Sequence, residues 1–79
     1  MVATATDNNY LSASRTGSTA VVHGFTNDQV ASKLMAMGVM PGSRIKLVRK
    51  APFGGGFYVK VDNFNLALRK EEAESIVLK

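Results

Sequence analysis

The amino-acid sequence predicts a mostly β fold, a small β-barrel of about five strands with one short inserted helix and a C-terminal helical turn. One observation is a series of short runs that are rich in β-branched residues or alternate between apolar and polar side chains, as half-buried strands do. The other is the length of 79 residues, which suits one small domain. In a sheet this small, closure into a barrel hides the strand edges.

Two parts of the chain differ in composition. Residues 1–9 are small and polar without a period, which predicts a flexible N-terminal tail. Residues 10–79 form the predicted barrel domain, and its first clear strand is STAVVHGF, which follows Gly17. The start of the chain lacks the charged and apolar regions of a signal peptide, and no window approaches the roughly 18 apolar residues of a membrane span. We therefore expect a cytoplasmic protein without direct membrane insertion.

A short helix of about three turns is predicted in TNDQVASKLMAMG. Thr26 and Gln29 have the spacing of a capping box at its start. Gly38 fits the position just after the last helical residue. Three apolar residues at helical spacing form one stripe, namely Val30, Leu34 and Met37.

A second strand is predicted directly after a turn. Pro41 and Gly42 are typical of the two central positions of a type II turn. From residue 44 the sequence RIKLVRK alternates, so the two basic side chains at its start, Arg44 and Lys46, should point away from the core. The stretch APFGGG then interrupts the pattern and predicts a loop.

A β-hairpin is predicted from FYVKV and FNLAL, which are joined by Asp62 and Asn63. If these two residues form the turn, Val61 and Phe64 face each other across the strands. That register places the apolar side chains of both strands on one side. The remaining RKEEAES predicts a solvated helical turn with balanced charges, and IVLK predicts a closing strand.

The residue types exclude several kinds of chemistry. The chain has no Cys and a single His, so it lacks thiolate metal ligands and a thiol nucleophile. His23 has no acidic residue near it in the sequence, which favours a structural or surface role over catalysis. We therefore predict no catalytic residues, no metal site and no cofactor.

The net charge of +4 leaves nucleic acid as an alternative partner. Tyr58 could stack on a base beside a group of basic residues, namely Arg44, Lys46, Lys50, Lys60 and Arg69. This alternative is disfavoured because acidic residues are interleaved and no RNA-binding signature is present. A groove for polyproline is also disfavoured, because the chain has no Trp and the hairpin register turns most aromatic side chains inward.

Three ordered motifs resemble the FeoA family of small proteins of bacterial ferrous iron transport. They are MGVMPG at residues 37–42, APFGGG at residues 51–56 and LALRKEEAESIVL at residues 66–78. LSASRTGSTAVVHGF matches the family more weakly. The resemblance covers residues 10–79 and implies an SH3-like barrel with one helix inserted after the first strand. In this chain Met37 and Val39 stand where the family has leucine, and Gly56 stands where it usually has proline.

The resemblance implies a non-enzymatic accessory role, through contact with the cytosolic region of the FeoB transporter. That partner would recruit the protein to the inner face of the membrane. A second copy of the chain is another partner to consider, and the alternative function is that of a small barrel that binds nucleic acid. Apolar residues at an exposed turn commonly serve a partner. The candidate contact residues are therefore Met37, Val39, Met40, Arg44 and Lys46.

Overall fold

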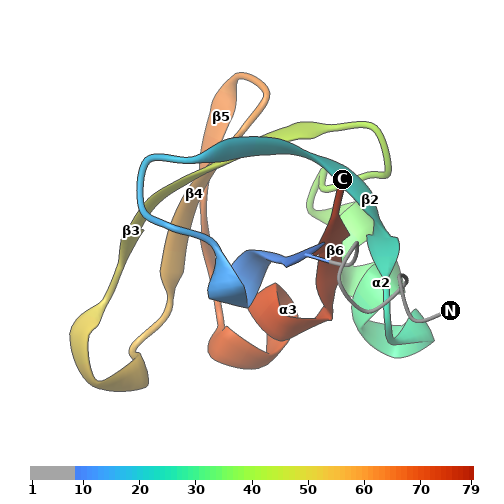
Figure 1. The fold of residues 1–79 in the computed structure, drawn as a ribbon. Coiled ribbons are helices and arrows are strands. Elements are labelled where there is room, and N and C mark those ends of the chain that lie inside the picture. The colour runs from blue at the N-terminus through green and yellow to red at the C-terminus, as the bar shows by residue number, and fades with distance from the viewer. Residues whose placement is uncertain (1–8) are drawn as a thin grey trace, which may run out of the picture.

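The computed structural model describes residues 9–79, so the predicted tail falls outside it except for Asn9, which begins the first strand. Short helices lie between most of the strands along the chain, whereas the fourth and fifth strands follow each other directly (Figure 1). In chain order they are β1 (Asn9–Tyr10), η1 (Leu11–Ala13), β2 (Thr19–Phe25), α2 (Asp28–Ala36), β3 (Arg44–Lys50), η2 (Pro52–Gly54), β4 (Phe57–Val61), β5 (Phe64–Leu68), α3 (Lys70–Ser75) and β6 (Ile76–Leu78).

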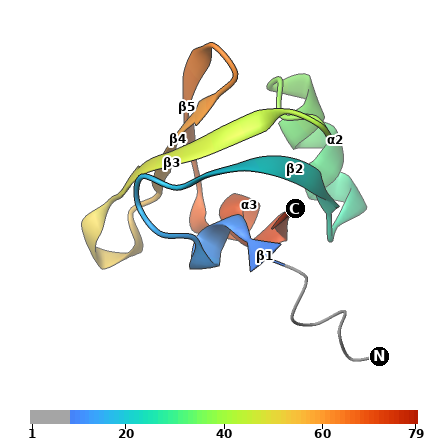
Figure 2. The same cartoon turned by 45° about the horizontal axis from the view of Figure 1, so that its top comes forward.

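The six strands form one antiparallel sheet in the order β1-β6-β2-β3-β4-β5. β2 joins its two halves, because residues 19–21 pair with β3 and residues 22–25 pair with β6 across an irregularity between Val22 and Gly24. β2 therefore arches over the molecule (Figure 2). The predicted strands are all present, and β1, which pairs with β6 through two residues, is a sixth strand that the sequence did not predict.

The barrel is curved but does not close by pairing its two end strands, which corrects the expectation that closure hides the edges. β1 and β5 stand at opposite ends of the strand order. β1 ends after two residues, and the chain turns at once into η1, which packs against α3. Among residues 9–79, no strand pairs with the outer edge of β5, so that edge is free within this part of the chain.

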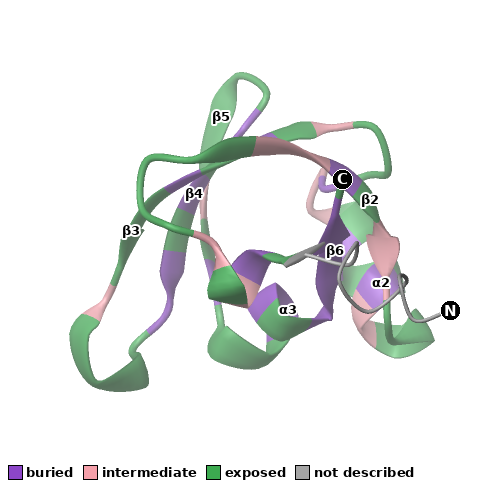
Figure 3. Ribbon diagram, in the orientation of Figure 1, coloured by how far each residue is buried: buried purple, intermediate pink, exposed green. Residues whose placement is uncertain are grey.

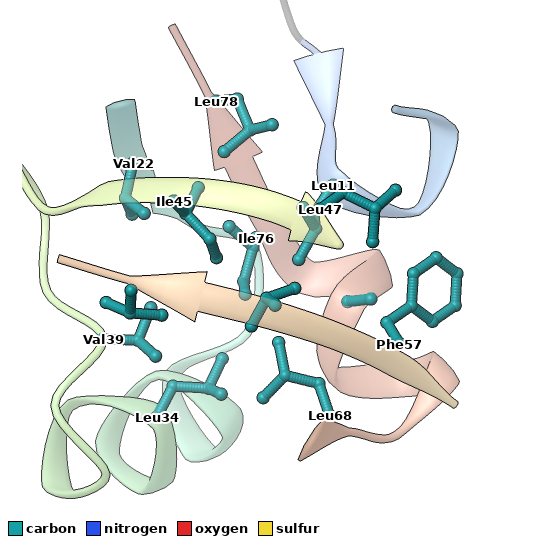
Figure 4. Close-up of a cluster of buried hydrophobic side chains, with 13 residues drawn as sticks. Leu11, Val22, Leu34, Val39, Ile45, Leu47, Phe57, Leu68, Ile76 and Leu78 are labelled. Atoms are coloured by element: carbon teal, nitrogen blue, oxygen red, sulfur yellow. The ribbon is translucent and has the colours of Figure 1, made fainter. Parts of the chain in front are cut away.

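One apolar core lies inside the curve of the sheet (Figure 3). The alternating strands supply it as predicted, because Ile45, Leu47 and Val59 are at most 1% exposed. Helix α2 contributes Leu34, and the connection after it contributes Val39, which lies beside Leu34 below β4 (Figure 4). Val30 and Met37 of the predicted stripe are only half-buried but pack against this core.

Helix α2 begins one residue later than the predicted capping box implies. The side chain of Asn27, not Thr26, caps it, and its Oδ1 accepts hydrogen bonds from the N–H groups of Gln29 (2.9 Å) and Val30 (3.1 Å). Thr26 is held elsewhere, since its N–H donates to the carbonyl oxygen of Ser75. The predicted helix end is confirmed, because Gly38 follows the C-cap with a φ of 102°.

The β4–β5 hairpin has the predicted register. Val61 pairs with Phe64 across the turn, and Asp62 adopts a φ of 50°. The side chains of β5 on this side are not equally buried, however. Leu68 at the base is 2% exposed, whereas Phe64 is 39% exposed because the hairpin tip projects beyond the body of the molecule (Figure 1).

Helix α3 is confirmed, but it is not the solvated turn that its charges predict. Glu72 is 5% exposed. One of its oxygens accepts the N–H of Arg69, and the other forms an ion pair with Lys33 of α2, both at 2.7 Å. None of the helices within residues 9–79 has the length and apolar character needed to cross a membrane.

Candidate partner-binding surface

The connection from α2 to β3 is a tight turn that holds Met40 on the surface. The N–H of Ser43 donates to the carbonyl oxygen of Met40 (2.9 Å), while Ser43 Oγ accepts the N–H of Met40 (3.2 Å). Gly42 has the φ of 94° that a type II turn requires, and its N–H donates to the carbonyl oxygen of Val22 on β2. The predicted turn is confirmed, and its bond to β2 anchors it. Met40 is 51% exposed.

Val39 is wrong as a contact candidate, because its side chain is fully buried. Its N–H donates to the carbonyl oxygen of Leu34 at 2.9 Å, which turns the side chain into the core below α2. Met40, the next residue, therefore faces outward. Of these two candidates, only Met40 lies on the surface.

An aromatic ring lies on Gly38, two residues before Met40. The ring of Phe64, at the hairpin tip, lies against Gly38, where a Cβ atom would be 2.7 Å from Cζ of the ring. Met37, one residue before Gly38, is half-buried. We call Met37, Gly38, Met40 and Phe64 the methionine corner. The sequence pattern assigned Phe64 to the core face and so did not predict its place here.

A shallow hollow of about 190 Å³ lies on the outer face of β3 and β4, next to the turn. It is lined by basic residues together with Thr19 and Asp62. Lys46 pairs directly with Lys60 across the two strands, an arrangement that like charges disfavour. Within residues 9–79, no carboxylate lies at ion-pair distance from the three residues that we call the basic strip, Arg44, Lys46 and Lys60.

The five basic residues considered for nucleic acid do not form one patch. Lys50 lies at the other end of β3, where its Nζ donates to the carbonyl oxygen of Ser12 and sits 5.6 Å from the centre of the Phe57 ring. Arg69 follows β5 at that same end. The structure therefore brings Arg44 and Lys46 together with Lys60 but separates them from Lys50 and Arg69.

The prediction that most aromatic side chains face inward is wrong. Phe57 is buried, but Tyr58 is 43% exposed, and the guanidinium of Arg49 lies 5.5 Å from its ring centre. Phe53 is fully exposed in η2 and has a φ of 59°. The alternating pattern could not place Phe53, because it lies in the loop where the alternation stops.

Two titratable side chains of the described residues, His23 and Glu72, have different surroundings. His23 lies exposed on β2. Burial by itself would raise the pKa of the Glu72 carboxyl, but hydrogen bonds from Lys33 and Arg69 and the positive charges of both outweigh it, so this pKa lies below its ordinary value. Its partners give Glu72 a structural role. Among residues 9–79, no three His, Cys, Asp or Glu side chains gather closely enough to hold a metal ion.

Comparison with known proteins connects this architecture with one family. Residues 10–79 match the profile of the FeoA domain. The NMR structure of a FeoA-like protein from Clostridium acetobutylicum superposes with a TM-score of 0.84 at 30% identity, over 92% of this chain and 86% of that one.

Two further structures are similar in fold. One is FeoA from Stenotrophomonas maltophilia in complex with zinc, with 30% identity, a TM-score of 0.75 and coverage of 90% of this chain and 89% of that one. It is described as a prokaryotic SH3 domain protein and a candidate activating factor of bacterial ferrous iron transport. The other is a manganese-dependent transcriptional repressor at 23% identity, which shares the fold with a TM-score of 0.81 over 90% of this chain and 40% of that one. The expected SH3-like fold is thereby confirmed.

Proposed function

The chain belongs to the FeoA family, and on that premise we propose that it is a non-enzymatic accessory protein that contacts the cytosolic region of the FeoB transporter. A structural neighbour described as a candidate activating factor of ferrous iron transport supports this role. Binding to the transporter would bring the protein to the inner face of the membrane. In this role the protein provides a binding surface for its partner and no catalytic group.

The observation that carries the proposal is the exposure of Met40 on a turn that is bonded to β2. A rigid turn loses little conformational freedom when a partner binds, so more of the contact energy appears as affinity. The flexible thioether side chain adapts its shape to a facing surface. Phe64 contacts Gly38, which Met37 precedes in the chain, so these residues add apolar side chains near the turn, and a few such residues can dominate the energy of an interface.

The basic strip lies beside this corner and would meet acidic groups of the same partner. Arg44 and Lys46 lack carboxylate partners among the described residues, so pairing them with an acidic surface breaks no ion pair within the protein. Such charges act mainly on the rate of encounter and on specificity. The alternative, a barrel that binds nucleic acid, has weaker support because only three of the five basic residues adjoin one another.

The test compares Met40→Asp with Phe53→Asp in a binding assay with the purified cytosolic region of FeoB. Both variants place a carboxylate at an exposed apolar position, but Phe53 lies in η2, after the end of β3 that is remote from the turn. We expect Met40→Asp to weaken binding at least about tenfold, a change of about 1.4 kcal/mol, and Phe53→Asp to bind as the wild type.

Circular dichroism and a thermal melt accompany the assay. If Met40→Asp unfolds, Met40 is part of the core and the proposed contact is wrong. If it stays folded and binds as tightly as the wild type, the methionine corner is not the interface. Equal losses in both variants would indicate a general effect of negative charge rather than a contact at this corner.

A further inference from the structure

The free edge of β5 exposes backbone groups whose direction follows from the ladder of β4. The N–H of Asp62 donates to the carbonyl oxygen of Arg44 on β3, at 2.8 Å. Because neighbouring residues of a strand point their backbone groups to opposite sides, Val61 and Val59 bond to β5 instead. Their register partners are Phe64 and Leu66. The N–H and C=O groups of the intervening residues of β5 therefore point away from the sheet.

Asn65 and Ala67 are these intervening residues, and both are exposed. Among residues 9–79, their backbone groups take part in no hydrogen bond outside the β4–β5 ladder. They form two donor–acceptor pairs along an open edge, which is the arrangement that an added strand requires.

The edge lacks the features that normally prevent strand addition. Exposed edges are commonly protected by charged residues, proline or a bulge. The sequence of β5 is FNLAL, with neither a charged residue nor a proline. Its pairing with β4 runs from Val61–Phe64 to Phe57–Leu68 without a shift of register. Strand β5 is therefore straight, neutral and open.

The outer face next to this edge carries a second hollow, of about 400 Å³. Exposed side chains of three strands line it, namely Val48, Tyr58, Asn65 and Ala67, together with Val59 and Leu66. Ala67 is the smallest of these and lies directly at the edge, across from Tyr58. An aliphatic side chain on an added strand, placed beside Ala67, would enter the hollow and cover apolar surface.

The charge beside the hollow is positive, and within residues 9–79 no carboxylate lies at ion-pair distance from it. Lys60 pairs with Asn65 across β4 and β5, and Lys46 pairs with Lys60 on the other side. An added strand could place an acidic side chain beside Asn65, on the side away from β4. The side chain of Lys60 is longer than that of Asn65, so it would reach across Asn65 to this acidic group. Charge complementarity therefore favours an acidic strand.

We propose that β5 binds an extended acidic peptide segment of a partner protein by strand addition. In the antiparallel orientation, an aliphatic residue lies beside Ala67, and an acidic residue two positions later lies beside Asn65. A second copy of the chain fits less well, because its β5 offers no acidic residue and each copy carries a net charge of +4. This site differs from the methionine corner and does not depend on the transporter as partner.

The first test follows amide hydrogen exchange of the full chain by NMR, with the capped nonapeptide TVTETVTET as probe. In the free protein, the amides of Asn65 and Ala67 should exchange faster than those of Leu66 and Leu68. Addition of the peptide should slow the exchange of Asn65 and Ala67 at least about tenfold, while TVTKTVTKT should have no effect. If the acidic peptide does not slow the exchange of the Asn65 and Ala67 amides, the proposal is wrong. Protection that rises with protein concentration alone would also overturn it, because it would identify a second copy as the occupant.

Variants then separate the backbone contribution from the charge contribution. Ala67→Pro removes an outward N–H without removing a bond to β4, and should abolish peptide binding, whereas Ala67→Thr retains the N–H and should bind. Lys60→Glu should weaken binding of the acidic peptide at least about tenfold, and Lys70→Glu, an equal charge change on α3, should not. Equal losses for Lys60→Glu and Lys70→Glu would contradict a local contact. If Ala67→Pro fails to fold, the exchange measurement on the wild type still decides the question.

Discussion

Glu72 shows at the scale of one residue how a charged side chain becomes part of the architecture. It lies in the first turn of α3 and reaches back to the N–H of Arg69, as a helix-capping carboxylate does. Its second oxygen holds Lys33 and so ties α2 to α3. Because the side chain of Lys33 is 58% exposed, the ion pair contributes less to stability than the partly buried hydrogen bond from Arg69.

Glu72→Gln should therefore lower the free energy of unfolding by about 1–2 kcal/mol at neutral pH, because it removes the charge from both contacts. The pKa of Glu72 is lower in the folded chain than in the unfolded one. Its stabilisation is then complete above the unfolded pKa and disappears as the pH falls through the folded pKa.

Denaturant unfolding of the wild type and Glu72→Gln across the acidic range measures this effect. The difference in stability should shrink as the pH falls, and Glu71→Gln, an exposed position on the same helix, should show little difference at any pH. A difference between wild type and Glu72→Gln that does not depend on pH would contradict the assignment.

At the scale of elements, the β4–β5 hairpin combines a correct register with uneven burial. Leu66 and Leu68 point to the same side, but Leu68 is 2% exposed and Leu66 is only half-buried. The base of the hairpin lies over the core, whereas its tip extends to the methionine corner. The packing contribution of β5 should therefore rise from Phe64 to Leu68.

Leu68→Ala should cost about 2–5 kcal/mol, the range for a fully buried leucine, and Leu66→Ala about half as much. Denaturant unfolding measures both losses of stability from the shift of the midpoint. The comparison requires that the unfolding free energy of each variant depends on denaturant concentration as steeply as that of the wild type. In a domain of this size the first variant comes close to unfolding the protein. Equal costs, or a larger cost for Leu66→Ala, would show that the gradient of burial along the hairpin is wrong.

At the scale of the whole molecule, the chain offers iron few ligands. It has no Cys and one His, and the acidic residues of positions 9–79 do not converge. Ferrous iron binds tightly where several nitrogen, oxygen or sulfur ligands meet. Anaerobic calorimetry of the protein with Fe²⁺ should accordingly show no stoichiometric binding at micromolar affinity.

His23→Ala is the control for that measurement. Weak binding that disappears in this variant would indicate metal held between chains by an exposed histidine. Stoichiometric micromolar binding that survives in His23→Ala would contradict the expectation and point to a site formed by other ligands.

Periodicity in the sequence is sufficient to predict most elements. The alternation in RIKLVRK and FYVKV places Ile45 and Val59 in the core, and the turn residues Asp62 and Asn63 set the hairpin register. Gly38 marks the end of the helix, since few other residues adopt its φ. These features depend on residues only a few positions apart in the chain, so they can be predicted from a single sequence.

The sequence by itself determined five of the strands, the helix after β2, the hairpin and the family, because local backbone preferences and short motifs specify them. Only the tertiary structure decided which side chains remain outside. It buries Val39 and Glu72, exposes Phe64 and leaves the edge of β5 open. Exposure depends on what distant segments cover: β1 pairs with β6 and not with β5, and Lys33 lies 39 positions from the carboxylate that it holds. Such contacts between remote segments leave no period in the sequence, and so they appear only when the chain is folded.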